Sequence, residues 1–545
     1  MDVEKVWERN ITGKGVTIAV NDIGIDTDLI DLERNINKEL CKNFFTNTPN
    51  VAPEHYTDYL DKPTVLSEHG NYVASVTAAV KNNYLCSAGI AYDATIVGLK
   101  MVTLNMTRNG FFYWTKSEIV SRSLTYKLHD IDIFVNAWAP PSHFDQLDLA
   151  TRKAIEDGAH KGRRGLGTIH VVPAGSYANV LSNNIHTITV NGVPSLGERR
   201  SKVVIDSSVL VSGLSDGNNL TSSSMVTTSY GNKCVRTFNG VSAAVSQVAG
   251  IIALGLQANR NLKLRDVQHL LIQASEHEQI ATRAEFKRNG ASKSFNKYFG
   301  FGLLNADRFV NLSKKHTSVP DPMSTNLLRY RNSNSGLYIQ IFEFCYDCNI
   351  DSTCLTLVEQ VILAISFTTA GHDLTAELIS PSGTQSMLMD LKFYHNQTYS
   401  TVAQEGKFVS VHFWGEEPFG NWQVKVYSVP FSSNTTVHNI SVTLHGTSQA
   451  SKRNDLIHCG KDSTDVNSSD NTGSQHLLTI ALVVAVVSFV LICTAITAVC
   501  FRSRCRSCNI ITLNNNLNIN NSGAADIDVI TEMLQRPVDR CETTL

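Results

Sequence analysis

The chain reads Val16-Thr17-Ile18-Ala19-Val20-Asn21-Asp22 near its start, and this stretch decides the fold class. Residues 16–20 form a short apolar run rich in β-branched side chains, which is typical of a buried strand. Asp22 follows at the end of that run. In parallel α/β sheets the residues that carry chemistry collect outside the carboxyl ends of the strands. The stretch therefore predicts a parallel α/β domain with Asp22 at its functional edge.

Two later segments begin helical patterns with a residue that complements Asp22. His69 opens a pattern in which apolar residues recur at spacings of three and four, and Ser242 opens an apolar pattern over 243–257. A serine hydroxyl needs a histidine to take its proton and an acid to hold that imidazole in the right tautomer. A helix start also offers free N–H groups and a positive dipole end, which favour a developing oxyanion. We therefore predict acyl transfer, with Ser242 as nucleophile, His69 as base and Asp22 as the orienting acid.

The order Asp, His, Ser along the chain resembles that of the subtilisins, and the likeness extends to the kexin/furin-like proprotein convertases, a branch of the subtilases. Residues 81–92, 162–169 and 298–306 look like further segments of the convertase catalytic domain. Residues 371–384 and 413–422 resemble the β-rich P domain found only in convertases. The resemblance implies an α/β subtilisin-like domain, with a parallel sheet flanked by helices, over residues 1–318. It also implies an all-β, jelly-roll-like P domain over residues 319–448.

The resemblance implies two structural features beside the catalytic residues. Cys86 and Cys234 stand where convertases have a disulfide. Two side chains and two backbone carbonyls stand where the family binds a structural calcium ion, and hard oxygen ligands of this kind suit calcium. The residues concerned are Asp31 and Asn83 for the side chains, and Val80 and Leu85 for the carbonyls. The alternative is that Asp31 and Asn83 occupy ordinary turns.

The chain departs from the convertase pattern where the oxyanion should be held. The family has Ala-Ser-Gly-Asn at this strand end, whereas the chain reads Pro173-Ala174-Gly175-Ser176, so Ser176 takes the place of the asparagine. A serine side chain is shorter than an asparagine side chain, and loss of such a donor costs about 10²–10³-fold in turnover. The sequence therefore predicts a weakened oxyanion hole.

The substrate pockets differ from the family pattern as well. Convertases recognise paired basic residues through a row of carboxylates, and after Trp138 only Asp148 remains in register with them. Each lost charge pair costs about 2–5 kcal/mol of binding. Trp138 and Asp148 are therefore the predicted substrate-binding residues of a site with altered specificity for basic residues.

Residues 477–501 form an uncharged run that is long enough, at ~1.5 Å per residue, to cross a hydrocarbon core of ~30 Å. Arg502, Arg504 and Arg506 follow at once, so the positive-inside rule places the C-terminus in the cytosol. We expect a single-pass type I membrane protein of the secretory pathway, at the Golgi or the cell surface. Its flexible stalk is expected over 449–476, its transmembrane helix over 477–501 and its cytosolic tail over 502–545. Asn-x-Ser/Thr sites lie before the span, so we expect a glycoprotein whose catalytic domain is lumenal or extracellular.

Partners are indicated by the charge and by the end of the chain. A net charge of −2 argues against nucleic acid as a partner, and the resemblance implies protein or peptide substrates. Thr543 stands two residues before the terminal Leu545, which fits strand addition to a PDZ domain. In the oxidising lumen Cys345 or Cys348 is expected to pair with Cys354, and the spacing does not decide between them.

The leading hypothesis is a membrane-anchored serine endopeptidase of the proprotein-convertase type, which hydrolyses peptide bonds in secretory-pathway proteins and holds a structural calcium ion. The alternative is a catalytically impaired pseudoprotease that acts as a binding or regulatory protein, and Ser176 and the lost acids motivate it. A surface adhesion protein ranks last, because it does not explain three intact catalytic residues. Met1 leads directly into the subtilase-like segment, so the sequence continues upstream with a signal peptide and a pro-segment or the product is defective. We expect the first, because the C-terminal half is built for the secretory pathway.

Overall fold

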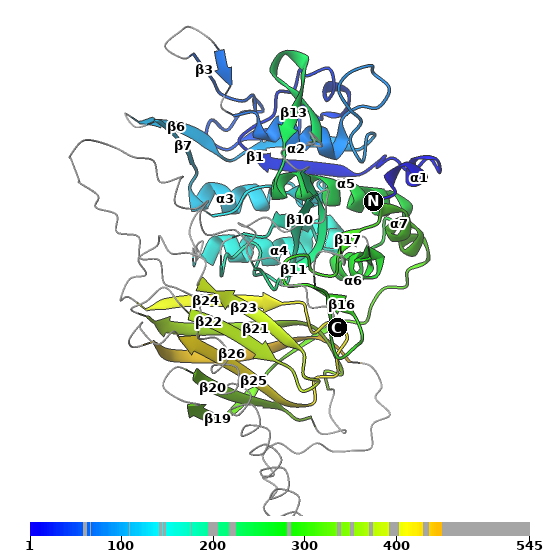
Figure 1. The fold of residues 1–545 in the computed structure, drawn as a ribbon. Coiled ribbons are helices and arrows are strands. Elements are labelled where there is room, and N and C mark those ends of the chain that lie inside the picture. Colours follow the sequence, from blue (N-terminus) through cyan, green and yellow to red (C-terminus); the bar gives the residue numbers. More distant parts are fainter. Residues whose placement is uncertain are drawn as a thin grey trace, which may run out of the picture. The chain divides into compact units, whose positions relative to one another are not determined.

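A nine-stranded sheet forms the centre of the N-terminal part of the chain (Figure 1). Its strand order is β14-β17-β11-β10-β9-β8-β1-β5-β2, and every neighbouring pair is parallel except β14 with β17. In that order the strands are Ser275–Glu276, Leu303–Leu304, Val209–Asp216, Thr187–Pro194, Ile169–Pro173, Ile133–Val135, Thr17–Asp22, Thr95–Lys100 and Lys42–Asn43. The expected parallel α/β sheet is therefore confirmed, and Asp22 is the last residue of β1.

The computed structural model describes residues 1–57, 63–65, 67–107, 110–140, 144, 149–175, 177–194, 205–216, 225–278, 280, 285–334, 339–348, 354–369, 374–391, 403–428 and 435–448. These residues belong to one unit, Met1–Lys461. The expected stalk, transmembrane helix, cytosolic tail and PDZ-type end lie outside the described residues.

Helices pack on both faces of the sheet because successive strand side chains point to opposite sides. Ile18 and Val20 of β1 belong to the core on the face covered by α2, α5, α6 and α7, whereas Ala19 belongs to the core on the face covered by α3 and α4. The helices are α1 Val3–Trp7, α2 His69–Ala78, α3 Ser117–Leu124, α4 Leu149–Gly165, α5 Val241–Ala258, α6 Leu264–Ala274 and α7 Ala306–Lys315. The backbone leaves the helical region within α4 at Gly162, Arg163 and Arg164.

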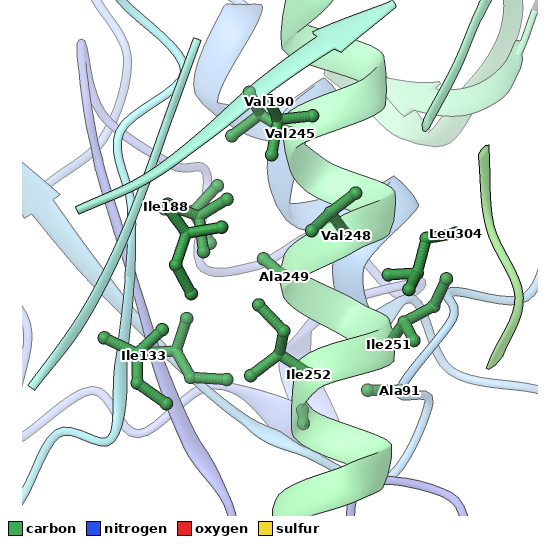
Figure 2. Close-up of a cluster of buried hydrophobic side chains, with 14 of the residues drawn as sticks. Ala91, Ile133, Ile188, Val190, Val245, Val248, Ala249, Ile251, Ile252 and Leu304 are labelled. Atoms are coloured by element: carbon green, nitrogen blue, oxygen red, sulfur yellow. The ribbon is translucent and has the colours of Figure 1, made fainter. Parts of the chain in front are cut away.

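Helix α5 is the central buried helix of the domain (Figure 2). Val245, Val248 and Ile252 lie in one core cluster with Ile133 and Ile188 of the sheet. Among the described residues α5 is the one helix with the length and hydropathy of a membrane span, but most of it is buried inside this domain. It is therefore a core helix, and its apolar character comes from burial against the sheet and neighbouring helices.

The C-terminal part of the described chain is a sandwich of two antiparallel sheets. One sheet has the order β18-β26-β21-β24, with strands Pro322–Asn326, Thr436–Thr447, Leu357–Thr368 and Gln404–Ser410. The other has the order β19-β20-β25-β22-β23, with strands Leu328–Asn334, Ile339–Tyr346, Gly420–Ser428, Leu374–Ile379 and Gln385–Asp390. Large side chains such as Trp422 and Phe367 fill the space between the sheets. The expected all-β second domain is confirmed, and a disulfide joins Cys348 to Cys354.

The sandwich packs against the α/β domain through buried contacts. Trp414 of the sandwich belongs to the main core cluster of the α/β domain. The side-chain amide of Asn289 donates to the carbonyl oxygens of His412 and Trp414, and the Ser207 hydroxyl donates to the carbonyl oxygen of Val409. Because these groups are buried, their hydrogen bonds fix how the two domains meet.

Candidate active site

Asp22 and His69 meet at the carboxyl edge of the sheet. The Nδ1 atom of His69 lies 2.8 Å from Oδ2 of Asp22, and Oδ1 of Asp22 accepts a hydrogen bond from the backbone N–H of Ile23 at 2.7 Å. Asp22 is buried, whereas 34% of the His69 side chain is exposed. The carboxylate therefore fixes the tautomer, so that Nδ1 carries the proton and Nε2 faces away from Asp22.

A glycine lets helix α2 start close enough to β1 for this contact. A Cβ atom at Gly70 would lie 2.0 Å from the carbonyl oxygen of Gly24, which is closer than any real contact. The backbone of Gly24 and the start of α2 therefore lie in direct contact. His69, as the first residue of α2, is thereby placed next to the end of β1.

The electrostatic surroundings of His69 suit a general base. Burial lowers the pKa of its imidazole, whereas the charge of Asp22 and the hydrogen bond to it raise that pKa, and the net result is a pKa above the ordinary 6.5. A base works best when its pKa is near the operating pH. The Asp22 carboxylate thus offsets the cost of holding a partly buried imidazolium.

Ser242 lies in the first turn of α5, after Gly240, whose φ of +80° turns the chain into the helix. Its hydroxyl donates a hydrogen bond to the carbonyl oxygen of Ala137 at 3.0 Å. Among the described residues no hydrogen bond joins Ser242 to His69. The structure thus brings Asp22 and His69 into contact, and it directs the Ser242 hydroxyl to the backbone of Ala137. Catalytic hydrogen bonds are often absent or long before substrate binds.

The other predicted substrate-site residues are only partly within the described chain. Ser176 and Asp148 lie outside the described residues. Trp138 follows β8 directly after Ala137, and its partly buried side chain packs against the core beneath α3 and α4. Gly175, at the end of β9, faces Ala139, because a Cβ atom there would lie 3.2 Å from the Cβ atom of Ala139. The ends of β8 and β9 therefore lie side by side next to Ser242.

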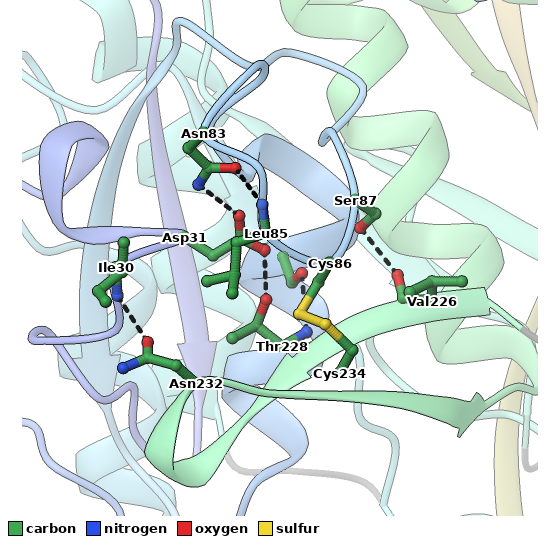
Figure 3. Close-up of a disulfide and its surroundings, with 11 residues drawn as sticks. Ile30, Asp31, Asn83, Leu85, Cys86, Ser87, Val226, Thr228, Asn232 and Cys234 are labelled. Carbon is green, nitrogen blue, oxygen red and sulfur yellow. Dashed lines mark hydrogen bonds between the residues drawn. A yellow bond between two sulfur atoms is a disulfide. The ribbon is translucent and has the colours of Figure 1, made fainter.

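The expected disulfide is present and ties the segment after α2 to a β-hairpin (Figure 3). Cys86 follows α2, and Cys234 lies on β13 (Lys233–Phe238), which pairs with β12 (Met225–Ser229). Ser87 donates to the carbonyl oxygen of Val226 in the same hairpin. The β12–β13 hairpin precedes α5, so the disulfide anchors the segment that leads to Ser242.

The residues expected to hold calcium do gather beside this disulfide. Oδ1 of Asp31 accepts from the amide nitrogen of Asn83 at 2.8 Å, and Oδ2 accepts from the hydroxyl of Thr228. Oδ1 of Asn83 in turn accepts from the backbone N–H of Leu85 at 3.1 Å. The backbone N–H of Val80 donates to the carbonyl oxygen of Asp31.

The Asp31 carboxylate decides whether this cluster could hold a hard cation. Asp31 is fully buried, and burial raises the pKa of its carboxyl group although Thr228 and Asn83 lower it. No cationic side chain of the described chain lies within ion-pair distance of Asp31. Within the same residues no three His, Cys, Asp or Glu side chains cluster as a metal site. An ion would therefore depend on one carboxylate and neutral oxygens, and the amide of Asn83 would have to turn its oxygen toward the ion.

Sequence reasoning missed three contacts of this site. Phe238 packs edge-on against the His69 ring, Ala137 accepts from Ser242, and Thr228 donates to Asp31. Phe238 stands four residues before Ser242, but an isolated aromatic residue at that spacing is not a signal for contact with a histidine. Ala137 acts through its backbone, so its side chain gives no signal at all.

Comparison with known proteins agrees with the geometry. Residues 13–302 match the model of the subtilase family, and residues 358–444 match that of the proprotein convertase P-domain. Neuroendocrine convertase 2 of Drosophila melanogaster is 30% identical over 473 residues, which cover 83% of this chain and 70% of that protein. Proprotein convertase subtilisin/kexin type 6 of Rattus norvegicus is 30% identical over 448 residues, which cover 79% and 46% of the two chains.

A solved structure shows the same fold at lower identity. The serine protease of Aeromonas sobria, in complex with its chaperone, superposes with a TM-score of 0.63 at 18% identity, covering 81% of this chain and 89% of that chain. That likeness supports the fold alone. The two family matches and the Drosophila relative lead to one conclusion: the chain belongs to the subtilase family and is a subtilisin-like serine endopeptidase of the proprotein-convertase type.

Proposed function

We propose that Asp22, His69 and Ser242 form the catalytic triad of this endopeptidase. The observation that carries the proposal is the 2.8 Å contact between Nδ1 of His69 and Oδ2 of Asp22. A buried carboxylate on one imidazole nitrogen leaves the other free to take a proton from a serine. Ser242, at the start of a neighbouring helix, is the serine that the sequence pattern indicates as the donor of that proton.

Catalysis begins when the Ser242 hydroxyl leaves the carbonyl oxygen of Ala137 and turns toward Nε2 of His69. His69 takes the hydroxyl proton while Oγ attacks the carbonyl carbon of the peptide bond, and Asp22 stabilises the imidazolium. The imidazolium then gives its proton to the leaving amine, and a water molecule repeats the sequence to release the acyl group. The backbone N–H of Ser242 and the hydroxyl of Ser176 would hold the oxyanion, and the short Ser176 side chain makes this a weakened hole.

The direct test compares peptide hydrolysis by the full chain and by the Ser242→Ala variant. We expect the variant to lose about 10⁶-fold in turnover, because removal of a triad serine has an effect of that order. An exposed serine of β18, Ser324→Ala, is the matched control and should leave turnover unchanged. Equal rates for wild type and Ser242→Ala would refute the triad.

A second candidate is a pseudoprotease that binds peptides through the same cleft. The hydrogen bond from Ser242 to Ala137 favours it, because that bond turns the nucleophile away from His69. The variant Ser176→Asn separates the two functions. A slow enzyme should gain about 10²-fold in turnover when the amide donor is restored, whereas a binding protein should stay inactive.

We further propose substrates and location from the sequence. Substrates would be proproteins of the secretory pathway, with altered preference for basic residues because most pocket acids are missing and Asp148 remains. The uncharged run at 477–501 supports a single-pass type I anchor with the protease in the lumen or outside the cell. Thr543 and Leu545 would bind a PDZ domain on the cytosolic side.

We also propose a structural calcium ion at Asp31, Asn83 and the carbonyl groups of Val80 and Leu85. The ion would neutralise the buried Asp31 carboxylate and brace the loop that carries Cys86. At a concentration of 100 times its dissociation constant it would stabilise the fold by ~2.7 kcal/mol. The test is the melting temperature of the full chain in calcium and in EGTA, with Asp31→Asn as the control that should lose the difference. Equal melting temperatures in wild type would contradict the proposal.

A further inference from the structure

Phe238 is the aromatic residue in contact with the proposed base. It is the last residue of β13 and only 5% exposed. Its ring centroid lies 5.8 Å from that of His69 with an interplanar angle of 76°, so the two rings meet edge to face. The same ring lies 5.6 Å from that of Tyr72, one turn further along α2. Edge-to-face contacts of this kind prefer a defined ring orientation.

The position of Phe238 is fixed from both ends of its strand. Met225 of β12 pairs with Phe238, and Cys234, four residues earlier, is tied to Cys86 by the disulfide. Phe238 also belongs to the main core of the domain. Strand β13 therefore places the Phe238 ring against His69, and the chain reaches Ser242, in α5, four residues later.

We propose that Phe238 is a positioning residue that holds the His69 ring between Asp22 and Ser242 and keeps water from the covered side of the imidazole. This inference rests on the proposed function. The Asp22 hydrogen bond fixes one nitrogen of the imidazole but leaves the ring free to pivot about that bond. An aromatic ring packed on its side removes that freedom. A misplacement of about 1 Å at a catalytic group can cost 10²-fold in rate.

Phe238 is an apolar neighbour of His69, and the titratable groups near His69 lie on other residues. From β1 the titratable neighbour is Asp22. Tyr72 of α2 contacts the Phe238 ring, and Glu68 directly precedes His69 in the chain. The carboxylate of Glu68 accepts hydrogen bonds from the hydroxyls of Tyr72 and Ser229. Arg236 of β13 is exposed. Removing the Phe238 ring would therefore hydrate the imidazole without changing the charges around it, and less burial means a higher pKa.

The test measures the rate at which a fluorophosphonate probe labels the full chain as a function of pH. Phe238→Leu and Phe238→Ala are compared with wild type, and Phe301→Leu is the matched control, since Phe301 is also buried in the same core. We expect labelling to slow by up to about 10²-fold in Phe238→Ala and less in Phe238→Leu. In both variants the acid limb of the profile should move to higher pH.

The control separates positioning from general stability. Phe301→Leu should lower the unfolding midpoint and leave the pH profile in place. An unchanged or lowered acid limb in Phe238→Leu, with wild type labelled normally, would overturn the inference alone. Absence of labelling in wild type would refute the proposed function and the inference together.

Discussion

The carboxyl edge of the sheet and its interior each hold a histidine, and the two imidazoles differ in pKa because only one has a carboxylate neighbour. His69 at the edge contacts Asp22, and its pKa lies above 6.5. His170 lies on β9 inside the sheet, 1% exposed, with its ring 4.9 Å from that of Phe134. Neither nitrogen of His170 has a hydrogen-bond partner among the described residues. Burial alone lowers the pKa of His170 to about 3, so it stays neutral at physiological pH.

The comparison shows that an acid partner, more than burial itself, makes a histidine into a base. Burial opposes the charged imidazolium at both positions, and only at the edge does a carboxylate compensate for it. The edge is where loops and helix starts bring polar groups together, whereas the interior offers apolar side chains.

The largest effect is expected from removal of the acid partner. Asp22→Asn keeps the shape of the site but loses the charge that orients and stabilises the imidazolium, so turnover should fall about 10⁴-fold. Peptide hydrolysis by the full chain measures this loss, and the exposed Asp28→Asn serves as the control. Activity within tenfold of wild type would show that His69 works without its carboxylate.

The second effect concerns the disulfide that anchors the β12–β13 hairpin. The double variant Cys86→Ala with Cys234→Ala removes a disulfide between residues 148 apart in sequence, and such a loss typically costs 2–5 kcal/mol. Urea denaturation of the full chain measures the cost. Cys41→Ala is the control, because Cys41 is buried and free and its removal breaks no cross-link. An unchanged denaturation midpoint in the double variant would mean that packing alone holds the β12–β13 hairpin.

The third effect, in the interior, is small near neutral pH and grows as the pH falls. The stability of the wild type should fall as the pH drops below 6.5 toward 3. In that range His170 binds a proton in the unfolded chain but stays neutral in the folded chain. His170→Leu removes that term, so its stability relative to wild type should rise by up to about 1.4 kcal/mol per pH unit below 6.5.

His69→Leu supplies the opposite sign. The raised pKa of His69 contributes stability that is fully present below pH 6.5 and is lost as the pH rises through the folded pKa. Urea denaturation at several pH values compares the two variants. If the free energy of unfolding relative to wild type changed with pH in the same direction for His170→Leu and His69→Leu, the difference between edge and interior would be refuted.

The sequence predicted the elements that carry the site, because each has a local signal. The β-branched run before Asp22 forms β1, the pattern after His69 forms α2, and the apolar pattern after Ser242 forms α5. The disulfide between Cys86 and Cys234 followed from the family resemblance. These features depend on periodicity or on residues that a family shares.

The remaining contacts depend on tertiary packing. The hydrogen bond from Ser242 to the Ala137 backbone depends on how β8 meets α5, and the contact between Phe238 and His69 depends on the path of the β12–β13 hairpin. The disulfide between Cys348 and Cys354 depends on backbone geometry that spacing does not determine. Ser176 and Asp148 lie outside the described residues, so their roles remain predictions.

The central claim is that the imidazole between Asp22 and the start of α5 activates Ser242. The most direct measurement is mass spectrometry of the full chain after reaction with a fluorophosphonate, since the probe marks only a serine that a base has activated. The account predicts one adduct per chain, on Ser242, that disappears in the His69→Ala variant. A folded chain with no adduct, or with an adduct on another residue, would contradict it.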